Sequence, residues 1–196
     1  MGYPLKKESE KKFTRADYLT WPEDERWEII DGDAYCMTPA PSIRHQDIVV
    51  NLVTQLKQKL SGGPCRTFVA PTDVVLSEYD VVQPDILVVC DKKKITDANI
   101  QGAPDLIIEV LSPYTSLKDK REKKALYERF GVREYIIVDP LEQYVERFLF
   151  EDDGTYGKGE VFGTQEVLQI NSLEGTDINL WEIFEVERPK EPGILG

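Results

Sequence analysis

The sequence predicts an α/β fold in which a mixed β-sheet is flanked by helices and followed by an antiparallel C-terminal meander. Three patterns predict it. They are helical apolar spacing over 42–60, short strand-like runs separated by turn residues over 66–111, and a near-continuous apolar run over 134–140. A run of the last kind is typical of a strand that is buried on both faces.

Length and composition predict one domain away from membranes. A chain of 196 residues, 41% of them hydrophobic, can bury one core. We expect a single domain over 13–187, preceded by a mobile N-terminal lead over 1–12 and followed by a C-terminal tail over 188–196. The lead is charged where a signal peptide would be apolar, and no apolar run is long enough to span a bilayer. We therefore expect no membrane partner and a cytoplasmic location.

The cysteines give a second reason for that location. Cys36, Cys65 and Cys90 are odd in number, and their spacings match no zinc or redox motif. We therefore expect reduced thiols in the core or at the surface, as is usual in the cytosol.

The N-terminal part is predicted to contain a short helix and a hairpin. The segment FTRADYL starts a helix near Thr14, which the Trp-Pro pair at 21–22 ends. The Asp-Gly pair at 31–32 favours a tight turn between two apolar runs. In the resulting hairpin, Glu28 shares a strand face with Ile30.

The longest predicted helix spans 42–60 and carries the only histidine of the chain. Its apolar residues recur at helical spacing, and Ser42 has the chemistry of an N-cap. At 100° per residue His45 lies roughly 20° from Leu52, so the histidine faces the core. Either His45 is a core histidine with one satisfied nitrogen, or it lies at the edge of a site.

The rest of the chain is predicted to complete the sheet and the meander. The expected elements are two or three strands over 66–89, a strand over 105–111, a helix over 116–130 that stops at Gly131, a strand over 134–140, a meander around the Asp-Gly turn at 153–154, and a short closing helix or strand over 179–184.

The charge is unevenly distributed. A net charge of −12 has the wrong sign for nucleic-acid binding, in which Lys and Arg neutralise phosphates. However, 118–133 carries seven basic and three acidic residues, whereas 141–196 carries four basic and thirteen acidic ones. The lysines at 92–94 add to the basic part. Either this part contacts phosphate, or its charges are ordinary solvated residues of a helix and a turn.

Two apolar runs are each interrupted by a carboxylate, which needs a partner when it is buried. Strand alternation places Asp85 of VVQPDILVV and Glu109 of DLIIEVL among the apolar residues of one strand face. Asp105 precedes Glu109 on the same strand by roughly 13 Å, too far to share one ion. We expect the other pair to meet across two strands, and Asp105 to cap or turn the backbone. The partner is a cation, a Lys or Arg, or a backbone donor.

Helical periodicity sorts the lysines of the last predicted helix. On a helical wheel, Asp119 lies near 20° and Lys123 near 60°, within the arc that faces the sheet. Lys120 and Lys124 lie near 120° and 160°, at the margin of this arc and outside it. They are solvated or contact phosphate. The alternative for Lys123 is an ordinary i, i+4 ion pair with Asp119.

Four ordered motifs resemble those of a known nuclease family. They are VVQPD at 81–85, PDLIIEVLSP at 104–113, D-x-x-x-K at 119–123 and GVREYIIVDP at 131–140. Together they resemble the Uma-type endonuclease family, a branch of the PD-(D/E)XK nuclease superfamily, from about Glu28 to Pro140. The resemblance implies the restriction-endonuclease-like fold.

One position departs from the superfamily pattern. The pattern has a lysine two residues after the acidic residue of the strand, where this chain has Leu111. In such branches the following helix can supply the lysine, and Lys123 is the one that periodicity turns inward. The resemblance therefore implies Asp85 and Glu109 as metal ligands, Lys123 as the migrated lysine, and Glu28 as an additional acidic member of the catalytic set.

The resemblance implies hydrolysis of DNA phosphodiester bonds with Mg²⁺ or Mn²⁺. Lys123 would orient or help to deprotonate the attacking water and offset charge on the phosphate. His45 matches a histidine position of the family, at the edge of the site. The residues expected to hold the substrate backbone are Lys92, Lys93, Lys120 and Lys124.

A second function stays open at this point. A protein with the nuclease fold but without the activity would act as a binding or assembly module, and both Leu111 and the net charge of −12 favour it. An active enzyme that cuts both strands of a duplex would favour a homodimer, because a two-fold axis relates the two strands.

Overall fold

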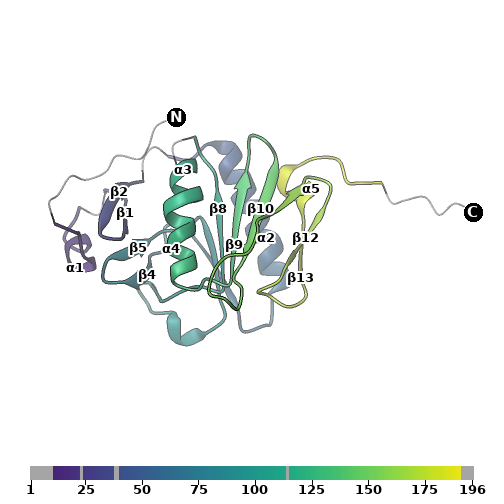
Figure 1. Cartoon of the computed structure of the whole chain (residues 1–196). Coiled ribbons are helices and arrows are strands. Elements are labelled where there is room, and N and C mark those ends of the chain that lie inside the picture. Colours follow the sequence, from purple (N-terminus) through teal and green to yellow (C-terminus); the bar gives the residue numbers. More distant parts are fainter. Residues whose placement is uncertain (1–10, 23, 38–39, 114, 191–196) are drawn as a thin grey trace, which may run out of the picture.

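A six-stranded mixed sheet forms the centre of the molecule, as Figure 1 shows. In the computed structural model, the described residues are 11–22, 24–37, 40–113 and 115–190. The strands of the sheet are β3 (Arg66–Val69), β6 (Ile86–Val89), β8 (Leu106–Val110), β9 (Glu134–Asp139), β10 (Tyr144–Leu149) and β11 (Glu160–Gly163). Their order is β11-β10-β9-β8-β6-β3, and β8 is parallel to β9 while the other neighbours are antiparallel. The predicted mixed sheet is confirmed.

The two faces of this sheet pack against two separate apolar clusters. On β8, Leu106, Ile108 and Val110 point to one cluster, whereas Ile107 lies in the other. The first face is covered by α2 (Ile43–Lys59), β12 (Val167–Ile170), β13 (Thr176–Asn179) and α5 (Leu180–Phe184). Glu109 has the parity of the second face. A carboxylate therefore enters the layer between that face and what covers it.

A smaller five-stranded sheet covers the second face. Its strands are β1 (Trp27–Ile30), β2 (Asp33–Cys36), β4 (Val74–Ser77), β5 (Asp80–Val82) and β7 (Ile100–Gln101), in the order β2-β1-β5-β4-β7. The predicted hairpin is confirmed as β1 and β2, and the predicted short helix as α1 (Arg15–Tyr18). The chain forms four strands between residues 66 and 89, not two or three, because β4 and β5 turn away into this second sheet.

The predicted long helix is confirmed as α2. The Ser42 hydroxyl accepts a hydrogen bond from the His45 backbone N–H at 3.2 Å and so caps the first turn. The His45 side chain faces inward as predicted, with 6% of its surface exposed.

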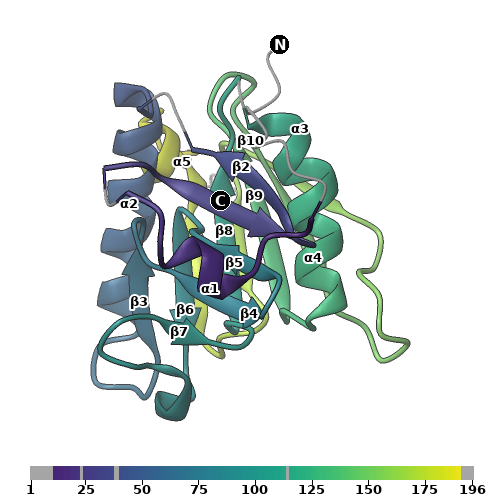
Figure 2. The ribbon, with the colours of Figure 1, turned by 90° about the vertical axis from the view of Figure 1, so that its left-hand side faces the viewer.

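The second predicted helix is interrupted by one wide turn. It consists of α3 (Ser116–Lys118), a π-helical segment η2 (Asp119–Lys123) and α4 (Lys124–Arg129). Figure 2 shows it on the other side of the sheet from α2. The helix ends at Phe130, and Gly131 follows in the left-handed region with φ of 69°. A π turn holds more residues than an α turn, so it rotates the residues that precede it around the helix axis.

The C-terminal meander is antiparallel, as predicted, but is divided between two sheets. β10 and β11 extend the central sheet, and the predicted turn lies between them, with Gly154 at φ of 85°. β12 and β13 form a separate pair. The closing segment is the helix α5.

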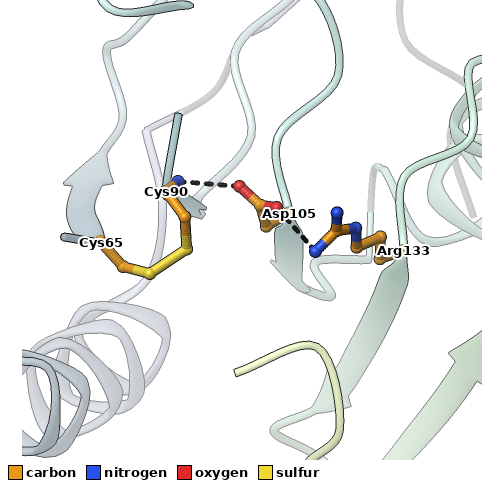
Figure 3. The surroundings of a disulfide bond; sticks show 4 residues. All are labelled: Cys65, Cys90, Asp105 and Arg133. Atoms are coloured by element: carbon orange, nitrogen blue, oxygen red, sulfur yellow. Dashed lines mark hydrogen bonds and ion pairs between the residues drawn. A yellow bond between two sulfur atoms is a disulfide. The ribbon is translucent and has the colours of Figure 1, made fainter. Parts of the chain in front are cut away.

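A disulfide joins Cys65 to Cys90, so the prediction of reduced thiols is wrong for these two residues. Figure 3 shows the bond. Arg66 pairs with Val89 across β3 and β6, and the next position outward places the two cysteines opposite each other. Cys36 takes no part in this bond. The expected cytoplasmic location loses this argument and stays a prediction.

The expected lead and tail lie largely outside the described residues, so the domain limits stay predictions. Of the lead, Lys12 forms an ion pair of 2.9 Å with Asp31 at the hairpin turn. Across the described part of the chain, no helix combines the length and apolar character needed to cross a membrane.

Candidate active site

The pairing of two central strands brings Asp85 and Glu109 together, as predicted. Ile86 lies opposite Ile108 in the antiparallel pair of β6 and β8, so the next position places Asp85 opposite Glu109. The Val110 backbone N–H donates to Asp85 Oδ2 at 2.8 Å, and the Asp85 N–H lies 3.4 Å from Glu109 Oε2. The two carboxylates thus meet at one end of the central sheet.

Each of these carboxylates has one oxygen that is held by protein donors. Glu109 Oε1 accepts hydrogen bonds from Lys123 Nζ and from the Tyr127 hydroxyl, both at 2.8 Å. Asp85 Oδ2 contacts His45 Nε2 at 3.2 Å in addition to the Val110 N–H. A carboxylate accepts, so Nε2 carries the proton in this contact. Asp85 Oδ1 receives no hydrogen bond from the described residues, and Glu109 Oε2 has only the long contact to Asp85 N–H.

Glu28 joins the hairpin to the same cluster. It is fully buried on β1, and its Oε1 accepts a hydrogen bond from the Gln83 backbone N–H at 3.0 Å. Lys123 Nζ lies 2.8 Å from Glu28 Oε1, and Lys118 Nζ contacts Oε2. Lys123 therefore bridges two carboxylates from two different sheets. The Lys123–Asp119 pair at i, i+4 is longer, at 3.7 Å, and is part of this larger cluster.

Lys118 is a member of the cluster that helical periodicity did not predict. On a regular wheel it lies roughly 80° before the zero of the buried arc and well outside it. The π turn η2 winds one additional residue into the helix and rotates Lys118 toward the sheet by about 100°. The side chain is 1% exposed, against 3% for Lys123. Nothing in the sequence pattern marks the π turn.

The cluster contains more negative than positive charge. Its carboxylates are Glu28, Asp85, Glu109 and Asp119, and its ammonium groups are Lys118 and Lys123. All but Asp85 have side chains that are at most 3% exposed. With every acid ionised and the histidine neutral, two negative charges are uncompensated in a poorly solvated place. Such an arrangement requires protons or a bound cation.

Burial and charge separate the two central glutamates in their protonation. Burial raises the pKa of Glu109 to about 8, and neighbouring carboxylates act in the same direction against the opposing charge of Lys123. Burial also opposes ionisation of Glu28, but the ammonium groups of Lys118 and Lys123 outweigh it and lower the pKa of Glu28 to about 2. At neutral pH Glu28 is thus the ionised partner of the lysines, and Glu109 holds a proton that a cation can replace.

A cleft of about 760 Å³ opens onto the cluster. Its lining includes Asp85, Glu109 and Lys123, together with His45 from the first turn of α2. Arg26 and Arg44 are the exposed or half-buried cations that line it. A substrate in the cleft can therefore reach the free oxygens of both carboxylates.

The lysines that we expected at the substrate backbone lie away from this cleft. Lys92 and Lys93 are in the short helix η1 (Lys92–Lys94), and neither lines the cleft. Lys120 donates to the Tyr144 hydroxyl at 3.1 Å, and Lys124 lies 4.4 Å above an aromatic ring. These two are likewise absent from the cleft lining as far as the structure describes it.

The oxygen donors at the cleft fit a hard divalent cation. No group of three or more His, Cys, Asp or Glu side chains in the described residues is arranged to hold a metal ion. Mg²⁺ is usually bound by one or two carboxylates and keeps several of its waters, so it does not need such a group. Asp85 Oδ1 and Glu109 Oε2 are the two oxygens with capacity for this role, and the excess negative charge favours a cation there.

A mixed sheet that carries paired acidic residues at the end of adjacent strands, with a lysine from the next helix, defines a restriction-endonuclease-like nuclease fold. The chain belongs to the Uma2 family, described as "Putative restriction endonuclease", whose family model matches residues 15–180. The family predicted from the four motifs is thereby confirmed.

Two similar proteins extend this comparison. An uncharacterized protein from Synechocystis sp. is 29% identical over 149 residues, which are 74% of this chain and 78% of that protein. A crystal structure from Anabaena variabilis, of "a putative nuclease belonging to DUF820", superposes with a TM-score of 0.73 at 21% identity. The match covers 88% of this chain and 98% of that one, and at this identity it shows the fold.

Proposed function

We propose that the protein is an endonuclease that hydrolyses DNA phosphodiester bonds with Mg²⁺ or Mn²⁺ as cofactor. The observation that carries this proposal is the excess of buried carboxylates at the cleft. Four carboxylates face two ammonium groups, and the two carboxylates with a free oxygen are Asp85 and Glu109. We assign these two as the metal ligands. A bound divalent cation would polarise a phosphate oxygen and lower the pKa of a bound water.

Lys123 acts as a fixed cation in this proposal. Burial disfavours its ammonium form, but Glu109, Glu28 and Asp119 outweigh burial and hold the pKa of Lys123 well above its ordinary value. A lysine that stays protonated donates hydrogen bonds and does not accept a proton. We therefore assign Lys123 to orienting the water and stabilising charge on the phosphate, and not to deprotonating the water.

Glu28 and His45 support this arrangement from behind. Glu28 holds the two lysines in place from the second sheet, at 2.8 Å from Lys123. His45 holds one oxygen of Asp85 and leaves the other facing the cleft. Lys92, Lys93, Lys120 and Lys124 lie outside the cleft, so they could contact only parts of the substrate that extend beyond it.

The test is a nuclease assay with supercoiled plasmid in Mg²⁺, in Mn²⁺ and in EDTA. Glu109→Gln and Lys123→Met keep the side-chain volumes and remove one charge each. We expect nicking by the wild type with either metal, none in EDTA, and a loss of at least about a hundredfold in each variant. Circular dichroism and thermal melting show whether each variant is folded.

Two results would contradict the proposal. Cleavage that persists in both folded variants, or in EDTA, removes the assigned site. A wild type that is inert on plasmid, single-stranded DNA and RNA favours the alternative, a nuclease-fold binding or assembly module. The same samples then serve to measure DNA retention without cleavage, which such a module predicts.

A further inference from the structure

One wall of the cleft is aliphatic and open to solvent. Helix α2 contributes Val49, Val50 and Val53, and the facing side contributes Val69 and Leu141. Exposure is 59% for Val50, 39% for Val69 and 83% for Leu141. Apolar side chains this exposed and lining one cleft mark a surface that has a binding role.

The cations at this cleft are few. Arg26 donates to the uncharged Gln83 Oε1 at 2.9 Å, so its charge stays available for a phosphate. Arg44 donates to the Phe184 carbonyl and lies 3.4 Å from Glu185, which takes up part of its charge. The two lysines of the cluster are buried and already paired.

A duplex is a poor match for such a surface. Duplex DNA presents phosphates and groove edges, it stacks its base faces inside, and its binding depends on several Lys and Arg contacts. The chain as a whole carries a net charge of −12. An unpaired strand instead offers its base faces for apolar contact and needs fewer cations for each nucleotide that is bound.

We propose that the cleft takes an unpaired stretch of a DNA strand, with a base against the wall formed by Val49, Val50 and Val53 and a phosphate near Arg26. This inference rests on the proposed nuclease function and names its substrate class. A volume of about 760 Å³ lies in the range of pockets that enclose one small ligand, here one or two nucleotides. An unpaired strand also needs one site only, so it removes the symmetry argument for a homodimer.

The test compares one sequence presented as a single strand, as a duplex, and as a duplex with an unpaired flap. Cleavage is measured in Mg²⁺ or Mn²⁺, and binding is measured by fluorescence anisotropy in EDTA, which does not depend on cleavage. We expect the single strand and the flap to be bound and cut at least about tenfold better than the duplex, with cuts confined to the unpaired part.

A matched pair of variants tests the wall itself. Val50→Asn places a neutral polar group on the wall, and Val161→Asn makes the same change at a valine of β11 that is 64% exposed and lies outside the cleft lining. We expect Val50→Asn to raise KM for the single strand roughly tenfold with little change in kcat, and Val161→Asn to behave as the wild type.

The outcomes separate this inference from the function on which it rests. Equal cleavage of duplex and single strand, or no effect of Val50→Asn on KM, overturns the inference and leaves the nuclease intact. Tight binding of the single strand by a protein that never cuts supports the cleft assignment and contradicts the nuclease. A protein that neither binds nor cuts contradicts both.

Discussion

The chain contains the same dipeptide, Pro-Asp, at two places in its central sheet, and the two aspartates have different surroundings. Asp85 follows Pro84 and precedes β6, while Asp105 follows Pro104 and precedes β8. Because β6 and β8 are antiparallel, the two residues lie at opposite ends of the sheet. Asp105 accepts a hydrogen bond from the Cys90 N–H at 2.8 Å and pairs with Arg133 at 3.4 Å (Figure 3).

The difference between the two ends is one of charge balance. Asp105 is matched by one guanidinium and one backbone donor beside the disulfide, and its neighbourhood is complete without further ligands. Asp85 is satisfied at one oxygen and lies beside three more carboxylates with only two ammonium groups. A Pro-Asp pair therefore does not identify a reactive site by itself. The residues that the sheet places across from it decide its role.

The largest expected effect follows from removing each aspartate in turn. Asp85→Ala removes a proposed metal ligand, and we expect a loss of nuclease rate of about a thousandfold with the fold retained. Asp105→Ala leaves the Cys90 N–H unpaired and is expected to lower the free energy of unfolding by about 1–2 kcal/mol. Arg133 is 69% exposed, so its ion pair adds little to that loss. We expect activity within about twofold of the wild type for Asp105→Ala.

Plasmid nicking and urea unfolding, measured on both variants, check this contrast. An active Asp85→Ala protein, or an Asp105→Ala protein that is folded but inactive, would show that the comparison assigns the two ends wrongly.

A smaller effect is expected from the group that holds Asp85. His45 Nδ1 is buried without a hydrogen-bond partner among the described residues, so the contact of Nε2 with Asp85 is the one that orients the ring. Glutamine carries its NH₂ group at the reach of Nε2, whereas asparagine carries it at the reach of Nδ1. We expect His45→Asn to weaken Mn²⁺ binding about tenfold and His45→Gln to restore most of it.

Electron paramagnetic resonance of free Mn²⁺ measures this affinity without any turnover. Equal affinities for the two amide variants would show that His45 only fills space in the core. A weakened His45→Gln protein with normal melting would show that the imidazole does more than donate to Asp85.

Much of this site follows from the sequence because its parts depend on strand pairing and helix phase. Alternation along two apolar runs predicted that Asp85 and Glu109 meet, and the antiparallel register of β6 and β8 has that result. Periodicity turned Lys123 inward correctly because only one turn separates it from the apolar residues of α4. Glu28 could be tied to the site only through the resemblance, since nothing in its strand indicates two lysine partners.

The parts that sequence reasoning missed depend on contacts between distant segments. Lys118 is brought into the cluster by a π turn, which no residue pattern marks. Tyr127 has the position of a core aromatic residue, and its hydroxyl meets Glu109 only after the helix docks. Cys65 and Cys90 are separated by 25 residues and become opposite only through the register of β3 and β6. In each case, local periodicity was correct and the tertiary partner was absent from it.

The smallest expected effect concerns one buried glutamate at each end of the sheet. Glu109 lies at the Asp85 end, and its pKa is raised by burial to about 8. Glu134 lies opposite Leu106 at the Asp105 end, and burial also raises its pKa, against a hydrogen bond from the Ser172 backbone N–H at 2.8 Å. A carboxyl with a raised pKa binds its proton more tightly in the folded state than in the unfolded state. Its contribution to stability is therefore full below the ordinary value of 4.5 and is lost as the pH rises.

For the metal-free protein in EDTA, we expect the free energy of unfolding to fall between about pH 4.5 and pH 8 and then to level off. The slope due to one group is at most about 1.4 kcal/mol per pH unit. Glu28, with its pKa lowered to about 2, loses its contribution only at more acid pH and does not disturb this window. Glu109→Gln should remove most of the fall, and Glu134→Gln should leave the part that ends near pH 8. Urea unfolding at half-unit pH intervals measures this, and a Glu109→Gln protein with the full wild-type slope would place the shared proton on another member of the cluster.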